Sequence, residues 1–175
     1  MKRMSSTTGQ VIRRATATLG LSIVLLLGQS AWAQDNCRQV EAAAVDVFSG
    51  GNSSSGNITH GGFLNGTRLT VYRPGGIFTQ DPNVVTFLGD MTLTTKKGQL
   101  KTSNVYLLDI VTQHGTALFR IDPGASTGRF AGATGLLFLN VGKAFVNGTV
   151  ITYLGDITGK ICFANQEALD PDDVR

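Results

Sequence analysis

Residues 84–121 read VVTFLGDMTLTTKKGQLKTSNVYLLDIVTQHGTALFRI. Apolar and polar side chains alternate over three stretches, which are separated by the dipeptides Lys97-Gly98 and His114-Gly115. Alternation with a period of two indicates strands with one buried face, and glycine after a polar residue is typical of hairpin turns. The stretch predicts three antiparallel strands: Val84–Thr95, Leu100–Thr112 and Thr116–Ile121.

Alternation also assigns side chains to faces, provided that the two hairpins pair Lys96 with Gln99 and Thr112 with Gly115. One face is then apolar and is the natural interior; it carries Val85, Phe87, Met91, Tyr106, Leu108, Ile110, Ala117, Phe119 and Ile121. The other face carries Asp90, Val105, Leu107, Asp109, Leu118 and Arg120.

The same pattern of short apolar runs and turn residues extends over most of the chain. Six further strands are predicted: Val40–Phe48, Asn57–Gly62, Leu64–Tyr72, Gly135–Val141, Lys143–Leu154 and Asp156–Phe163. Residues 49–56 are expected to form a loop rich in serine, glycine and asparagine. Many strands joined by tight turns predict an all-β fold, a single antiparallel up-and-down barrel of eight to nine strands, whose closure removes exposed sheet edges.

The first 33 residues are predicted to be a cleaved signal peptide. A basic start precedes a short apolar run, Leu19–Gly28, and the small-residue sequence Ala31-Trp32-Ala33 suits cleavage before Gln34. The run is shorter than the roughly 20 residues of a membrane-spanning helix. Residues 34–164 would then form the barrel domain and residues 165–175 a polar, acidic, disordered tail, in a secreted or periplasmic protein with no integral membrane segment.

The overall charge of +3 comes from the leader. Four of the 15 basic residues and none of the 12 acidic residues precede Gln34, so the remaining chain carries 11 basic and 12 acidic residues. A chain close to neutrality offers no electrostatic footprint for nucleic acid, and no nucleic-acid partner is expected.

Two cysteines, Cys37 and Cys162, stand near the two ends of the predicted barrel domain. In an oxidising compartment an even pair favours a structural disulfide. The alternative is a pair of buried free thiols.

Residues 126–135 read STGRFAGATG, in which Gly128, Gly132 and Gly135 flank a single aromatic residue, Phe130. We interpret them as a structural turn motif whose phenyl ring plugs the core. The segment resembles the G-T-G-x-F-x-G-A-x-G sequence of the allene oxide cyclase and dirigent superfamily, and in particular its uncharacterised exported bacterial members. The resemblance spans about residues 55–163 and implies a closed, calycin-like eight-stranded barrel able to hold a small apolar ligand; no catalytic position of the plant enzymes matches a residue here.

Tyr106 is the leading pocket candidate because it lies on the apolar face and a buried phenol needs a hydrogen-bond partner. Asn104 precedes it on the same face, and Phe87, Met91 and Phe119 would line the same space. The alternative is a core tyrosine whose hydroxyl reaches backbone or solvent.

Asp90, Asp109 and Arg120 form a second candidate group on the opposite face, either as a polar spot in a pocket or, as we favour, as external charges in an exposed ion pair. The two histidines, His60 and His114, lack further ligands at useful spacing, so no metal or cofactor is expected.

On the outer face, Leu88, Val105, Leu107 and Leu118 would form an exposed apolar patch. Such a patch predicts a homo-oligomer unless loops or the tail cover it.

Few ionisable residues converge on the predicted interior, which favours binding over catalysis. The sequence thus predicts an exported barrel that binds a small apolar molecule or acts as an extracytoplasmic interaction scaffold. The alternative is an isomerase or cyclase that confines a small apolar substrate in the barrel, with Tyr106 as a polar handle and its catalytic residues unknown.

Overall fold

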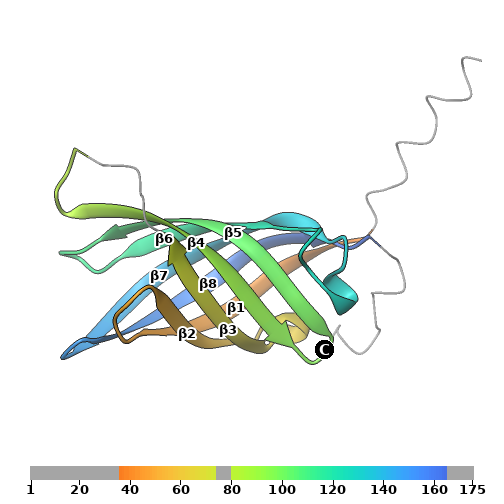
Figure 1. Ribbon diagram of the computed structural model, residues 1–175, viewed down its shortest axis with the longest axis horizontal. Coiled ribbons are helices and arrows are strands. Elements are labelled where there is room, and N and C mark those ends of the chain that lie inside the picture. The colour runs from red at the N-terminus through yellow and green to blue at the C-terminus, as the bar shows by residue number, and fades with distance from the viewer. Residues whose placement is uncertain (1–35, 74–79, 165–175) are drawn as a thin grey trace, which may run out of the picture. The chain divides into compact units, whose positions relative to one another are not determined.

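The computed structural model describes residues 36–73 and 80–164 and contains eight strands, labelled in Figure 1. Their bounds are β1 Cys37–Phe48, β2 Ser53–Thr59, β3 Gly66–Arg73, β4 Val84–Thr95, β5 Gly98–Asp109, β6 Gly115–Ile121, β7 Thr134–Asn147 and β8 Val150–Cys162. Two short 3₁₀ turns, η1 (Gly62–Leu64) and η2 (Gly128–Phe130), complete the elements.

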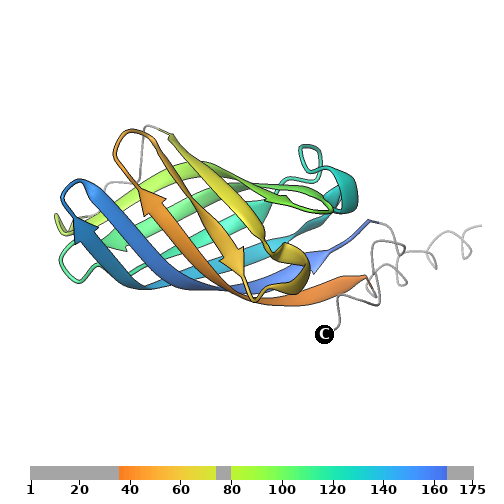
Figure 2. The ribbon, with the colours of Figure 1, turned by 90° about the horizontal axis from the view of Figure 1, so that it is seen from below.

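Each strand pairs antiparallel with its neighbours in sequence, and β8 returns to pair with β1. The prediction of an all-β, up-and-down closed barrel is therefore confirmed. The β1–β2, β5–β6 and β7–β8 turns lie together at one end of the barrel, here called the mouth, while η1 and η2 lie at the other end, here called the base (Figure 2).

Two predicted elements differ from the structure. β7 continues to Asn147 through an irregularity in its pairing between Val141 and Lys143. The segment predicted as one strand, Lys143–Leu154, therefore belongs to both β7 and β8, which are joined by a turn at Gly148. β2 begins at Ser53, inside the predicted loop, because pairing with both β1 and β3 stabilises a segment of low intrinsic strand propensity.

The two hairpins of residues 84–121 have different registers from those predicted. Thr95 pairs with Gly98, and Leu108 pairs with Gly115 across a longer loop. Both shifts are by an even number of residues, so the two faces keep their assignment. Val85 and Ile110 were wrongly placed inside: they lie at the mouth, where the barrel wall ends, and are 37% and 51% exposed.

The base of the barrel is closed by aromatic side chains. Phe130 of η2 is fully buried, with ring centroids 6.5 Å from Phe63 and 6.2 Å from Phe163. The Arg129 guanidinium lies over the rings of Phe63 and Phe163 at 5.1 and 5.2 Å. This packing blocks access to the interior from the base.

Gly128 allows η2 to approach the β4–β5 turn closely. Its φ is +60°, and a side chain there would meet the backbone oxygen of Lys97. The backbone N–H of Arg129 donates to the same oxygen at 2.9 Å. Gly132 and Gly135 also have positive φ, and a side chain at Gly135 would meet the backbone of Lys160.

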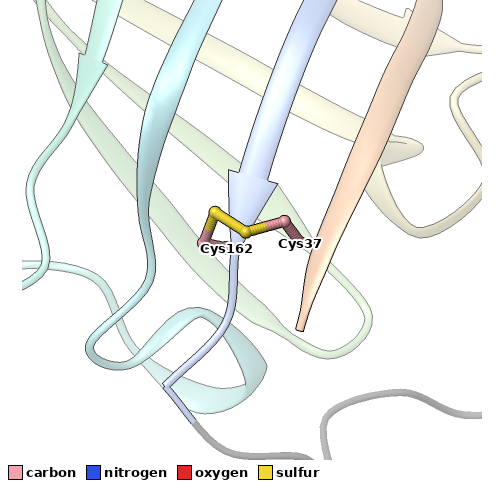
Figure 3. The surroundings of a disulfide bond; sticks show 2 residues. All are labelled: Cys37 and Cys162. Atoms are coloured by element: carbon pink, nitrogen blue, oxygen red, sulfur yellow. A yellow bond between two sulfur atoms is a disulfide. The ribbon is translucent and has the colours of Figure 1, made fainter. Parts of the chain in front are cut away.

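The predicted disulfide is present. Cys37 and Cys162 are directly paired in the β1–β8 register and joined by an S–S bond (Figure 3). The bond covalently links the first and last strands of the barrel over a sequence separation of 125. The predicted leader, residues 1–33, and the predicted tail, residues 165–175, lie outside the described residues.

Within residues 36–73 and 80–164, no helix is long and apolar enough to cross a membrane.

Candidate functional site

A cavity of about 260 Å³ lies at the mouth of the barrel. Phe48, Tyr72, Phe87, Leu108 and Tyr153 line it together with the backbone of the β1–β2 turn at Gly51. Four of these side chains are aromatic rings that alternation along β1, β3, β4 and β8 directs inward. The mouth cavity therefore offers large, flat, apolar surfaces.

The mouth cavity leads to a smaller inner cavity of about 40 Å³. Tyr72, Phe87, Leu108 and Tyr153 line both cavities. The wall of the inner cavity is apolar apart from its tyrosines, Thr116 and one charged residue, Asp46. Space of this size accommodates a few water molecules or the polar head of a small ligand.

Aromatic rings continue from the cavity into the core. Phe87 and Tyr106 stack with centroids 4.8 Å apart and planes within 9° of parallel. Tyr72 packs edge-on against both of them at 5.1 and 5.6 Å. Because each ring is held by two others, the cavity wall is fixed before any ligand arrives.

Beneath the rings lies a buried ion pair that the sequence analysis did not find. Arg68 Nη2 is 3.3 Å from Asp46 Oδ2, with the Arg68 side chain fully buried and that of Asp46 8% exposed. Ser54 Oγ donates to the same carboxylate oxygen at 2.7 Å. Since the single Ser54 hydroxyl proton is used there, the Tyr72 hydroxyl donates to Ser54 Oγ, also at 2.7 Å.

A second set of polar side chains continues from Arg68. Arg68 Nη2 donates to Thr70 Oγ1 at 3.3 Å. On β5, Thr102 Oγ1 donates to Asn104 Oδ1 at 2.6 Å and Asn104 Nδ2 donates to the Tyr106 hydroxyl at 2.9 Å. The middle of the barrel is thus a polar layer between the aromatic mouth and the apolar base.

The polar layer leaves some hydrogen-bonding capacity unused. Among the described residues, Asp46 Oδ1, Arg68 Nε and Arg68 Nη1 are buried and have no hydrogen-bond partner. Native proteins pair most such groups, so each unpaired one requires an explanation.

Burial raises the pKa of the Tyr72, Tyr106 and Tyr153 phenols above the ordinary tyrosine value. For Tyr153, the negative charge of Asp46 also raises the pKa. Asp46 and Tyr153 are directly paired across β1 and β8, so the field of the carboxylate reaches the cavity wall. All three phenols are protonated, neutral hydrogen-bonding groups near neutral pH.

The structure brings together only some of the predicted pocket residues. Phe87 and Tyr106 line the inner cavity. Asn104 lies in the polar layer, while Met91 and Phe119 are fully buried core residues outside the cavity walls. The Tyr106 ring faces the cavity, but its hydroxyl is engaged with Asn104.

Asp90, Asp109 and Arg120 do not form one cluster, which corrects the predicted proximity of Asp109 and Arg120. The β5–β6 register places Arg120 opposite Ser103, far along the strand from Asp109. Asp90 instead pairs with Arg73 at 3.0 Å on the outer surface. Backbone N–H groups of Thr112 and Val111 donate to Asp109 Oδ1 and lower the pKa of that carboxyl group.

Neither histidine belongs to the site. His60 is an exposed residue after β2, and His114 Nε2 lies 3.1 Å from the backbone oxygen of Gly142. Across the described ranges, no group of three or more His, Cys, Asp or Glu side chains could hold a metal ion.

The outer apolar patch is a continuous row across four strands. Leu88, Val105, Leu118 and Phe138 occupy successive paired positions on β4, β5, β6 and β7. We call these four residues the outer row. Val105 and Phe138 are 43% and 44% exposed, and Leu107 lies beside the row at 45%.

Alternation could have placed Asp46 and Arg68 on inward faces, although it could not have placed them next to each other. Asp46 follows Ala42 and Ala44 on the inward face of β1, and Arg68 precedes Thr70 and Tyr72 on the inward face of β3. Opposite charges on the inward faces of two strands are the sequence signal for a buried ion pair. Pairing them requires knowing that β2, with Ser54, lies between β1 and β3.

The chain matches no known protein family model, no curated protein and no solved structure.

Proposed function

We propose that this protein is exported and binds a small, mostly apolar molecule in the mouth cavity. The observation that carries the proposal is the aromatic cavity of about 260 Å³, which opens inward to a carboxylate in a barrel plugged at its base. Concave apolar walls with a few convergent polar groups are the usual form of a small-molecule site. The resemblance of residues 126–135 to the allene oxide cyclase and dirigent superfamily supports the same function.

Export is supported by two features. The basic and then apolar leader ends in Ala31-Trp32-Ala33, as exported precursors do. The disulfide between Cys37 and Cys162 suits an oxidising compartment outside the cytoplasm.

The second candidate function is an isomerase or cyclase, and Asp46 favours it. A carboxylate in the wall of an apolar cavity, connected through Ser54 to the Tyr72 hydroxyl, could accept or return a proton. Tyr106 would contribute its ring to confining the substrate, because its hydroxyl is already bonded to Asn104.

The test is to fill the mouth cavity and measure binding of naphthalene, a flat apolar probe, by calorimetry. Leu108→Trp places an indole in the cavity, whereas Leu69→Trp adds the same group on the outer face, where Leu69 is 49% exposed. We expect Leu108→Trp to weaken binding at least tenfold and Leu69→Trp to leave it unchanged. Equal effects of the two variants, or no binding to the parent protein, would contradict the proposal.

Native mass spectrometry of the protein from its own host complements this test. A retained small molecule, displaced by naphthalene, would identify the chemistry to assay. Conversion of the retained molecule into an isomer of the same mass during incubation, followed by chromatography, would favour the isomerase or cyclase.

A further inference from the structure

Asp46, at the inner end of the cavity, has one carboxylate oxygen without a hydrogen-bond donor among the described residues. Asp46 lines the inner cavity, and its Oδ2 receives both Ser54 Oγ and Arg68 Nη2. Its Oδ1 is buried and has no hydrogen-bond partner among the described residues. Burying a carboxylate oxygen without a hydrogen-bond donor costs free energy. The site therefore favours a ligand that supplies a donor.

Arg68 influences which ligand charges can bind in the cavity. Its fully buried guanidinium balances the Asp46 carboxylate but does not form part of either cavity wall. A ligand therefore meets the carboxylate first, with the positive charge behind it. A second carboxylate would be repelled by Asp46, and an ammonium group would have to share Asp46 with Arg68 in a poorly solvated site.

We propose that Asp46 is the specificity-determining residue of the cavity, selecting apolar ligands whose head is an uncharged hydrogen-bond donor, such as an alcohol, and rejecting carboxylates. This inference rests on the proposed function of the mouth cavity. The ligand body lies among Phe48, Tyr72, Phe87 and Tyr153, and its hydroxyl donates to the Asp46 carboxylate. The inner cavity of about 40 Å³ has room for such a head and not for a second ring.

The environment of Tyr153 supports the placement of the Asp46 carboxylate nearer to the cavity than the Arg68 guanidinium. Tyr153 lies opposite Asp46 in the β1–β8 register, and the negative charge of Asp46, after burial, contributes to the rise of the pKa of its phenol. The Tyr153 side of the cavity wall therefore senses the carboxylate, whereas at Tyr72 and Tyr106 the positive charge of Arg68 also acts and offsets part of the rise in phenol pKa that burial causes.

The experiment compares four probes that share one flat body: naphthalene, 2-naphthalenemethanol, 2-naphthoate and 2-naphthalenemethylamine. In the parent protein we expect the alcohol to bind about tenfold more tightly than naphthalene, since a hydrogen bond to a charged group contributes on this scale. The carboxylate should bind at least tenfold more weakly than naphthalene, and the ammonium probe more weakly than the alcohol. This ranking needs no variant.

Two variants then assign the preference to Asp46. Asp46→Asn removes the charge and keeps an acceptor, so the carboxylate should gain affinity relative to naphthalene. The double variant Asp46→Leu/Arg68→Met replaces the whole pair by apolar groups, which avoids leaving one charge buried alone, and the alcohol should lose its advantage over naphthalene. The Leu69→Trp protein serves as the control whose ranking stays that of the parent.

The possible failures are distinguishable. If naphthalene binds but the alcohol does not bind more tightly, a water molecule satisfies Asp46 and the inference is wrong while the binding function stands. If the ammonium probe binds best, the cavity selects cations and the inference is equally wrong. If no probe binds, the proposed function fails, and the inference fails with it.

Discussion

Asp46 and Arg68 form an ion pair inside the barrel, with Arg68 Nη2 3.3 Å from Asp46 Oδ2. They reach each other across β2, which contributes Ser54 to the same carboxylate oxygen. An interior that alternation predicted to be apolar therefore has a charged layer at its centre. Among the described residues that line the inner cavity, Asp46 of this layer is the only charged one. The layer also makes the barrel sensitive to the loss of either partner.

Removing one partner of this pair should destabilise the protein strongly. Arg68→Met leaves the Asp46 carboxylate buried and uncompensated, and we expect a loss of about 3–5 kcal/mol in the free energy of unfolding. The double variant Asp46→Leu/Arg68→Met should lose less than the sum of the two single changes. Urea unfolding of the unchanged protein, the two single variants and the double variant gives the coupling free energy between Asp46 and Arg68. Additive effects would contradict an energetic pairing.

Breaking the disulfide should destabilise the barrel at its β1–β8 seam. Replacing both Cys37 and Cys162 by serine releases a constraint on the unfolded chain worth about 4–5 kcal/mol in the loop-entropy model. Chemical unfolding with and without reductant measures the difference, and the double-serine variant should no longer respond to reductant. Detection of free thiols in the untreated protein would refute the bond.

The stability of the protein should fall at alkaline pH. Tyr72, Tyr106 and Tyr153 are the only tyrosines, and burial raises the pKa of each in the native state. Below about pH 10 neither the native nor the unfolded chain ionises them, so their contribution to stability is complete. Above about pH 10 the unfolded chain loses protons that the native chain retains, which favours unfolding.

Phenolate absorbance during a pH titration checks this directly. The native protein should show almost no tyrosine ionisation at a pH where the urea-unfolded protein is half ionised. A native titration curve that overlays the unfolded one would show that the phenols are solvated, contrary to their position in the cavity wall.

Gly128 should tolerate alanine less well than Gly148 does. The two glycines have nearly the same φ, +60° and +62°, so a side chain strains the backbone equally at both. Only at Gly128 would the new Cβ meet a backbone atom, the oxygen of Lys97, whereas nothing lies within 4 Å at Gly148. We expect Gly148→Ala to cost about 1 kcal/mol and Gly128→Ala clearly more, measured by thermal unfolding. Equal losses would mean that η2 moves away from the β4–β5 turn without penalty.

The outer row should mediate self-association. Leu118 lies within the row and is 37% exposed, whereas Leu69 is more exposed but lies outside it. We expect light scattering to show a defined oligomer for the parent protein, a monomer for Leu118→Lys and an unchanged oligomer for Leu69→Lys, because contiguous apolar surface drives association. A parent protein that stays monomeric at high concentration would exclude this role.

The sequence alone determined the fold class, the faces of the three strands within residues 84–121 and the disulfide partners. Alternation along residues 84–121 reports which side chains share a face, and this survives register errors of two or four residues. The cysteines could be paired because there are only two of them and the predicted leader suits export to an oxidising compartment.

Only the tertiary structure decided which inward side chains meet. Asp46 and Arg68 lie on strands separated by β2, whose serine-rich first half was predicted to be a loop, so no local pattern brings them together. The register of β5 with β6 likewise separated Asp109 from Arg120. Periodicity is a property of one strand, whereas a site in a barrel depends on closure and on pairing across strands, which are non-local and fixed only when the sheet closes.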